Sequence, residues 1–154
     1  MQGKPAIIDV LNETLTIELT AINQYFIHSR LCGHWGFTKL EEKLYKESIG
    51  EMKHADKLIQ RILFLDGVPE IARYNPIRVG KDVPTVFAND LALEASGVAN
   101  LNKGIALCLK ENDGGSRELL EYILLGSEEH VDWLETQISA YQATGIQNFL
   151  AEHL

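Results

Sequence analysis

The 154-residue chain is poor in cysteine, and its two cysteines, Cys32 and Cys108, lie far apart with no Cys-x-x-Cys spacing. This argues against a zinc ribbon, a thioredoxin motif and a disulfide framework. No apolar run is long enough to span a membrane, and the amino terminus lacks the basic and then apolar pattern of a signal peptide. We therefore expect a cytoplasmic protein with reduced thiols and no membrane partner.

Runs of basic residues are also missing, because lysine and arginine are scattered singly and the formal net charge is -8. Nucleic-acid recognition normally needs a basic patch, so we expect no nucleic-acid partner. The length fits one domain over residues 1–154, and the hydrophobic content of 45% is enough for a packed core.

What the chain does have is helical periodicity. Apolar residues recur every three or four positions in four long segments and a short one, and no segment alternates as a strand does. Glycine and proline mark the breaks between them. Helices are expected at about residues 5–32, 38–65, 83–111, 116–144 and 146–152. The long connector before the third helix fits a crossover between parallel helices, so the pattern predicts an all-α, ferritin-like four-helix bundle with a short fifth helix.

Carboxylates interrupt the apolar stripes of the first three long segments. They are Glu18, Glu51 and Glu94, and histidines accompany the stripes of the second and fourth segments at His54 and His130. Taken singly, a glutamate at a stripe edge is usually solvated and a lone histidine is usually a hydrogen-bonded core residue. Three carboxylates that face one another inside a bundle, however, need a cation or shared protons, and a metal is the natural solution.

The spacing of these residues supports the metal hypothesis. Glu18 and Glu94 are 76 residues apart, and so are His54 and His130, which indicates an internally duplicated bundle. Glu51 and His54 form a Glu-x-x-His pair, whose members share one helix face and can reach one metal. This is the pattern of the di-iron carboxylate proteins, and these ligands suit iron or manganese with positions left open for dioxygen. All five residues are therefore candidate metal ligands and catalytic residues.

One carboxylate of that pattern is missing. The duplication predicts a glutamate at position 127, where the chain has Ser127. A hydroxyl is a much weaker iron ligand than a carboxylate and bridges two metals poorly. Glu128 and Glu129 point about 100° and 200° away around the helix, so neither replaces it without a change in helix winding. The remaining ligands are expected to hold one iron or a loose, asymmetric pair.

The chain resembles the bacterioferritins over essentially its whole length. The resemblance is carried by the blocks AINQYF, EMKHAD, DLALE and DWLE at residues 21–26, 51–56, 90–94 and 132–135. It implies a hollow shell of about 24 subunits that oxidises Fe(II) with dioxygen or peroxide, stores the ferric mineral, and releases iron with the help of a small electron-donor protein. By matching position, it also implies that one iron is held by Glu18, Glu51 and His54, and the second by Glu51, Glu94 and His130, with Ser127 in place of the second bridging carboxylate.

The resemblance further implies haem b at a two-fold dimer interface, held by a methionine from each partner. Met52 matches that methionine, and it points about 100° away from Glu51 around the helix, toward solvent or a partner. By spacing alone, a methionine is ordinary core filler. A second departure from the family occurs at Lys46 and Gly50, where bacterioferritins often carry metal-binding side chains that face the shell interior.

Two kinds of function stay open at this point. The chain could be an iron-storage ferroxidase that Ser127 impairs, or a haem-carrying structural subunit of a shell that relies on a second bacterioferritin subunit with a complete centre. A rubrerythrin-like peroxidase is disfavoured because two cysteines cannot build its cysteine-ligated iron module. A DNA-protecting miniferritin is disfavoured by the acidic charge and the short fifth helix.

Overall fold

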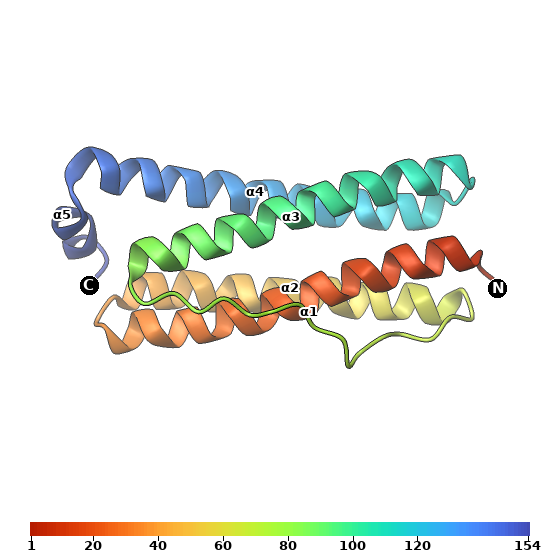
Figure 1. The fold of residues 1–154 in the computed structure, drawn as a ribbon, viewed down its shortest axis with the longest axis horizontal. Helices are drawn as coiled ribbons and strands as arrows, with labels where there is room; N and C mark the ends of the chain where they lie inside the picture. Colours follow the sequence, from red (N-terminus) through yellow and green to blue (C-terminus); the bar gives the residue numbers. More distant parts are fainter.

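The computed structural model describes all 154 residues and contains five helices and no strand (Figure 1). The helices are α1 (Pro5–His34), α2 (Thr38–Phe64), α3 (Val83–Lys110), α4 (Gly114–Thr144) and α5 (Ile146–Ala151). This confirms the all-α bundle with a short fifth helix that the periodicity predicts. No helix combines the length and the apolar character that crossing a lipid bilayer requires.

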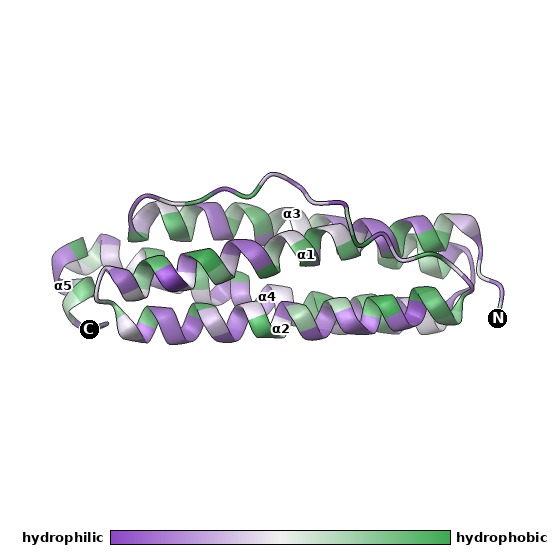
Figure 2. Cartoon of the chain, turned by 90° about the horizontal axis from the view of Figure 1, so that it is seen from below, coloured by the Kyte–Doolittle hydropathy of each residue, from purple (hydrophilic) through white to green (hydrophobic).

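The bundle consists of two antiparallel helix pairs joined by a long crossover. α1 packs mainly on α2, and α3 packs mainly on α4. The crossover, residues 65–82, returns along the whole length of the bundle, so α2 and α3 run in the same direction (Figure 1). In the view of Figure 2 the crossover lies along α1 and α3, on the side away from α2 and α4.

Side-chain caps decide where two helices begin. The Asp82 carboxylate accepts a hydrogen bond from the Thr85 backbone N–H at 2.9 Å, which caps α3. Asp113 accepts from the Ser116 backbone N–H at 3.0 Å, and α4 therefore begins at Gly114, two residues before the predicted start. The two glycines that were expected to form the break belong instead to the first turn of a capped helix.

The apolar core is split into two clusters, one toward each end of the bundle. The first is built around Leu11, Leu58 and Leu120, and the second around Leu44, Phe87 and Leu134. The helix segments between these clusters carry buried polar and charged side chains instead. The bundle is thus apolar at both ends and polar in the middle.

A ladder of polar side chains on α1 holds the crossover in place. Its members follow one another at intervals of four residues and so share one helix face: Asn12, Thr16, Thr20, Gln24 and His28. Backbone N–H groups of the crossover donate to four of them, including Asn75 to Thr20 at 3.0 Å and Gly80 to His28 Nε2 at 2.9 Å. Because buried N–H groups need partners, this ladder lets a long irregular segment pack on the bundle.

His28, the last residue of the ladder, also links the crossover to α3. His28 Nε2 accepts from Gly80, so its other nitrogen carries the proton and donates to the Asp90 carboxylate at 2.8 Å. Gln24 donates to the same carboxylate oxygen, also at 2.8 Å. Burial raises the pKa of Asp90, and the hydrogen bond from His28 opposes this shift.

Two glycines of α3 differ in the space around them, which allows a matched test of the packing. A Cβ at Gly104 would lie 2.9 Å from Leu120 Cδ1 and 3.0 Å from Val10 Cγ1, whereas one at Gly97 would meet only Ile17 Cγ2 at 3.6 Å. Gly104→Ala is expected to lower the free energy of unfolding by about 1–3 kcal/mol through overpacking. Gly97→Ala should raise it by about 0.5–1 kcal/mol, because alanine favours the helix and the site has room.

Denaturant unfolding of the assembled protein, followed by circular dichroism, would measure both changes. Equal effects of the two substitutions would contradict the packing described for α3.

Candidate metal centre

The three stripe carboxylates converge in the polar middle of the bundle. Glu18 comes from α1, Glu51 from α2 and Glu94 from α3, and each side chain is almost completely buried. His130 reaches the same region from α4 and is also buried, while His54 is partly exposed. All five residues singled out in the sequence are therefore brought to one region of the fold.

The first candidate ligand group consists of Glu18, Glu51 and His54, whose potential ligand atoms all lie within 4.8 Å of one another. His54 Nδ1 is 3.1 Å from Glu51 Oε2 and 3.5 Å from Glu18 Oε2. Glu18 Oε2 is buried and has no hydrogen-bond partner. A buried carboxylate oxygen that accepts no hydrogen bond is costly even with His54 3.5 Å away, so this group fits a cation in chemistry as well as in spacing.

The second candidate group contains a residue that the sequence reasoning missed. Glu47, Glu51 and His130 also have potential ligand atoms within 4.8 Å of one another, so Glu51 belongs to both groups. Glu47 lies one helical turn before Glu51 and shares its face of α2. Two signals in the sequence pointed to Glu47: this spacing, which is too common on helices to be distinctive, and the block ESI at residues 47–49, which also carries the family resemblance. Neither gave Glu47 a ligand role.

Glu94 belongs to neither group, although it lies beside the second. The Tyr25 hydroxyl donates to Glu94 Oε1 at 2.5 Å, and His130 Nδ1 lies 3.0 Å from the same oxygen. Burial, together with the charge of Glu94, raises the pKa of Tyr25 well above its usual value. Tyr25 thus stays a neutral donor that keeps Glu94 aimed at His130.

Ser127 is buried on α4 but belongs to neither ligand group. Glu128 and Glu129, which follow it, are both exposed. Glu129 lines the same cavity as Glu51 and His130, yet it is also absent from both groups. α4 therefore brings one histidine and no carboxylate to the two groups.

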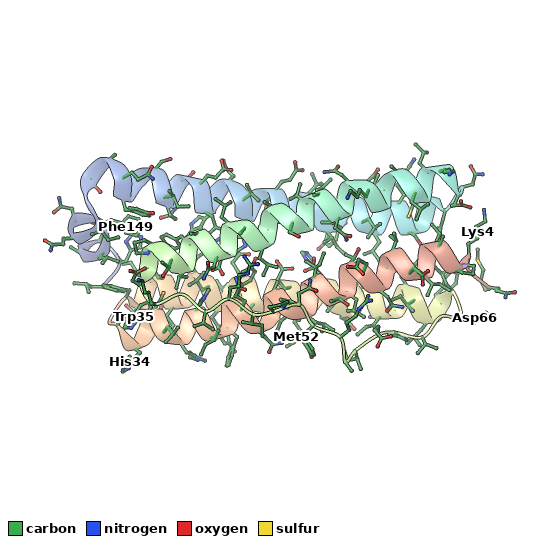
Figure 3. The ribbon with its side chains drawn as sticks, viewed as in Figure 1. Lys4, His34, Trp35, Met52, Asp66 and Phe149 are labelled. Carbon is green, nitrogen blue, oxygen red and sulfur yellow. The ribbon has the colours of Figure 1, made fainter.

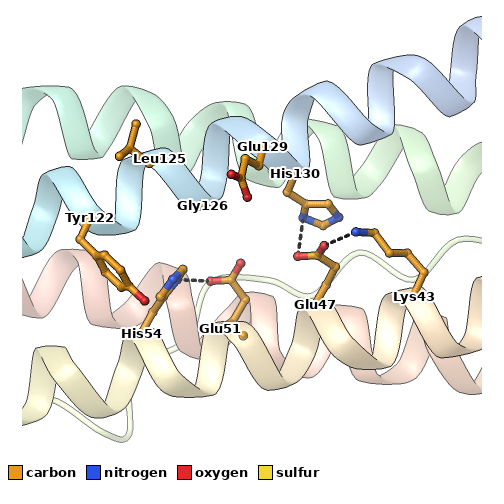
Figure 4. A pocket seen from close by; sticks show the side chains of 10 residues that line it. Lys43, Glu47, Glu51, His54, Tyr122, Leu125, Gly126, Glu129 and His130 are labelled. Carbon is orange, nitrogen blue, oxygen red and sulfur yellow. Dashed lines mark hydrogen bonds and ion pairs between the residues drawn. The ribbon is translucent and has the colours of Figure 1, made fainter.

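A cavity of about 400 Å³ opens between α2 and α4 over these residues (Figure 4). Glu47, Glu51 and His54 line it from α2, and Glu129 and His130 line it from α4. A small ion in the cavity can therefore reach Glu51, the carboxylate that both groups share.

The pKa shifts of Glu51, His54 and His130 all favour the protonated form of the side chain. Burial raises the pKa of Glu51, and its hydrogen bond with His54 opposes the shift. Burial alone would lower the pKa of His54 and of His130, but hydrogen bonds and attraction to Glu51 and Glu94 respectively outweigh it, so both values are raised. A metal that binds here must displace these protons, so binding weakens as the pH falls.

Comparisons with known proteins identify the family of the chain. A ferritin-like domain matches residues 8–143. The bacterioferritin of Mycobacterium leprae is 45% identical over 99% of this chain and 96% of its own length. A bacterial ferritin of Synechocystis is 44% identical over 100% of this chain and 99% of its own length, and the bacterioferritin of Streptomyces coelicolor is 43% identical over 98% and 90%. The chain belongs to the bacterioferritin family.

This confirms the family that the sequence blocks suggested. As a bacterioferritin, the chain is an iron-storage subunit that binds iron and assembles into an oligomeric shell.

Met52 of this bacterioferritin lies midway along α2 and points out of the bundle (Figure 3). Its side chain is 53% exposed, and other large apolar side chains on α1 and α2 are exposed as well, among them Phe26, Tyr45 and Leu63. Exposed apolar side chains of this size indicate a surface that a partner covers.

The position shared by both ligand groups gives a prediction for metal-dependent stability. Added Zn(II) at about 100 times its dissociation constant should stabilise the wild-type chain by about 2.7 kcal/mol per occupied site. Glu51→Gln removes a ligand from both groups and should abolish this effect, whereas Glu18→Gln should remove only the part that belongs to the first group. Differential scanning calorimetry with and without Zn(II) would measure it. A full zinc response in Glu51→Gln would refute the shared-ligand geometry.

Proposed function

We propose that this bacterioferritin oxidises Fe(II) at the centre around Glu51 and passes the product to a mineral store inside the shell. The observation that carries the proposal is that Glu51 belongs to two adjacent ligand groups in a cavity open to small ions. Two iron ions held by a shared carboxylate can each give one electron to the same dioxygen or peroxide molecule.

The ligands divide into a complete half and an incomplete half. Glu18, Glu51 and His54 hold the first iron, and the unpartnered oxygen of Glu18 supports this assignment. Glu51 and His130 serve the second iron, and Glu94, the further ligand that the family resemblance implies, lies beside them at 3.0 Å from His130 Nδ1. Ser127 offers no carboxylate to bridge the pair, so we expect oxidation that is slower than a complete centre would allow.

The second candidate is a haem-carrying structural subunit of a mixed shell, in which another bacterioferritin subunit oxidises the iron. It is favoured by Ser127 together with the exposed Met52. The complete first group and the cavity above it favour retained oxidation by this chain. An Fe(II) oxidation time course on the chain produced alone distinguishes the two, since the structural subunit would show no oxidation above the protein-free rate.

Met52 is proposed to bind haem b between two subunits of a 24-subunit shell. The exposed thioether of Met52, on a helix that carries further exposed apolar side chains, would suit a haem ligand at a subunit interface. A haem bound here would supply one-electron chemistry for the release of stored iron, for which we propose a small electron-donor protein as the partner. The chain's own part is to position the thioether and to exclude water with the apolar residues around it.

Restoring the missing carboxylate should raise activity. Ser127→Glu is expected to increase the initial rate of Fe(II) oxidation by about tenfold, because it returns a bridging ligand to the second iron. Stopped-flow absorbance of ferric product measures the rate, with Ser127→Ala as the control that adds no ligand. A wild-type rate in Ser127→Glu, in a variant that folds and assembles, would show that the serine is not the defect.

Removing the thioether should remove the haem. Met52→Ala is expected to lose the visible absorption of bound haem while keeping the helical circular dichroism and the shell, since Met52 is exposed and lies outside both core clusters. Leu109→Ala, at an exposed position on α3 away from the Met52 surface, is the matched control and should retain haem. Unchanged haem content in Met52→Ala would rule out the assignment.

A further inference from the structure

We propose that Glu47 supplies the carboxylate that Ser127 lacks, so that the second metal lies between Glu47, Glu51 and His130, and that Lys43 controls its affinity by competing for Glu47. This rests on the proposed function, in that the centre must bind metal at all. It moves one ligand of the second metal from α4 to α2.

The positions of three side chains support Glu47 as a ligand of the second metal. Glu47, Glu51 and His130 bring two carboxylates and an imidazole within 4.8 Å of one another, and Ser127 belongs to no such group. His130 Nδ1 lies 3.7 Å from Glu47 Oε2 and 3.0 Å from Glu94 Oε1, so one nitrogen faces both carboxylates. Carboxylate oxygen with imidazole nitrogen is a ligand set for a divalent transition metal.

The surroundings show that this group is more than a set of surface acids. His130 is 1% exposed, and burying an imidazole against carboxylates is stable only with a shared proton or a metal. Glu51 joins the group to the buried, unpartnered oxygen of Glu18 on its other side. The cavity between α2 and α4 gives an ion access to all three ligands.

Lys43 makes Glu47 a ligand that can be withdrawn. Lys43 Nζ pairs with Glu47 Oε1 at 2.8 Å, while the other oxygen of Glu47 faces His130 (Figure 4). The same ammonium lies 5.0 Å from the centre of the Trp133 ring, which helps to hold it there. Glu47 therefore stands between an ammonium and the metal position.

Two consequences follow for the second metal. The positive charge of Lys43 repels a divalent cation at the adjacent position, and the ion pair must loosen before Glu47 can coordinate fully. The second metal should therefore bind more weakly than the first, whose ligands have no lysine partner.

Anaerobic titration of the assembled protein with Co(II), followed by visible absorption, tests the ligand. The wild-type chain should bind two Co(II) per subunit in two steps of different affinity. Glu47→Gln should lose the weaker step, and the double variant Glu47→Gln/Ser127→Glu should regain it. Glu42→Gln, which makes the same charge change at an exposed position on α2, should behave as wild type.

Each outcome has a distinct meaning. Two full steps in Glu47→Gln, or a single step in the wild-type chain, would overturn the assignment of Glu47 while leaving the iron centre in place. Absence of any Co(II) binding by the wild-type chain would overturn the proposed function as well.

A second variant tests Lys43 and does not depend on the folding of Glu47→Gln. Lys43→Met should tighten the second Co(II) step by about tenfold and leave the first unchanged, because it removes the competing charge. Lys103→Met removes an exposed lysine from α3 and should change neither step. An unchanged or weaker second step in Lys43→Met would show that Lys43 does not control the site.

Discussion

The structure depends on a carboxylate, Glu51, that is buried in the middle of a helix bundle and shared by two groups of potential ligands. Charge at this place opposes folding, because carboxylates that face one another without water must hold protons or a cation. The two apolar clusters at the ends of the bundle supply the packing that keeps the polar middle together. Stability and ligand binding are therefore separated along the length of the same four helices.

α1 contributes both to the metal centre and to the packing of the crossover. One of its faces brings Glu18 and Tyr25 to the centre, and another carries the polar ladder from Asn12 to His28 that binds the crossover. Since the crossover covers α1, residues 14–21 of this helix are buried on every side. The crossover leads directly into the helix that holds Glu94, so the hydrogen bonds of the ladder also help to fix a residue of the centre.

The sequence predicted those features that repeat or interrupt a pattern. Glu18, Glu51 and Glu94 stood out because a hydrophobic residue was expected at each, and the 76-residue offset tied them together. Glu47 gave no comparable signal, because its partnership with His130 depends on how two helices face each other across the cavity. The ladder was missed for the same reason, since polar residues four apart on a helix normally face water. The start of the fourth helix was misplaced because the Asp113 cap outweighs the low helix propensity of Gly114 and Gly115.

Ser127, at the position where the internal duplication predicts a glutamate, also makes the two ligand groups differ from each other. In a duplicated bundle, equivalent helices bring equivalent ligands, and two metals bind alike. Here the first group lies around buried carboxylates, whereas the second depends on Glu47, whose side chain is 22% exposed and already paired with Lys43. A ligand near water is screened by salt and is free to change partners, while a buried one is not. On the proposed assignment the two halves of the centre are therefore unequal, and a metal at the second group would be held less firmly than one at the first.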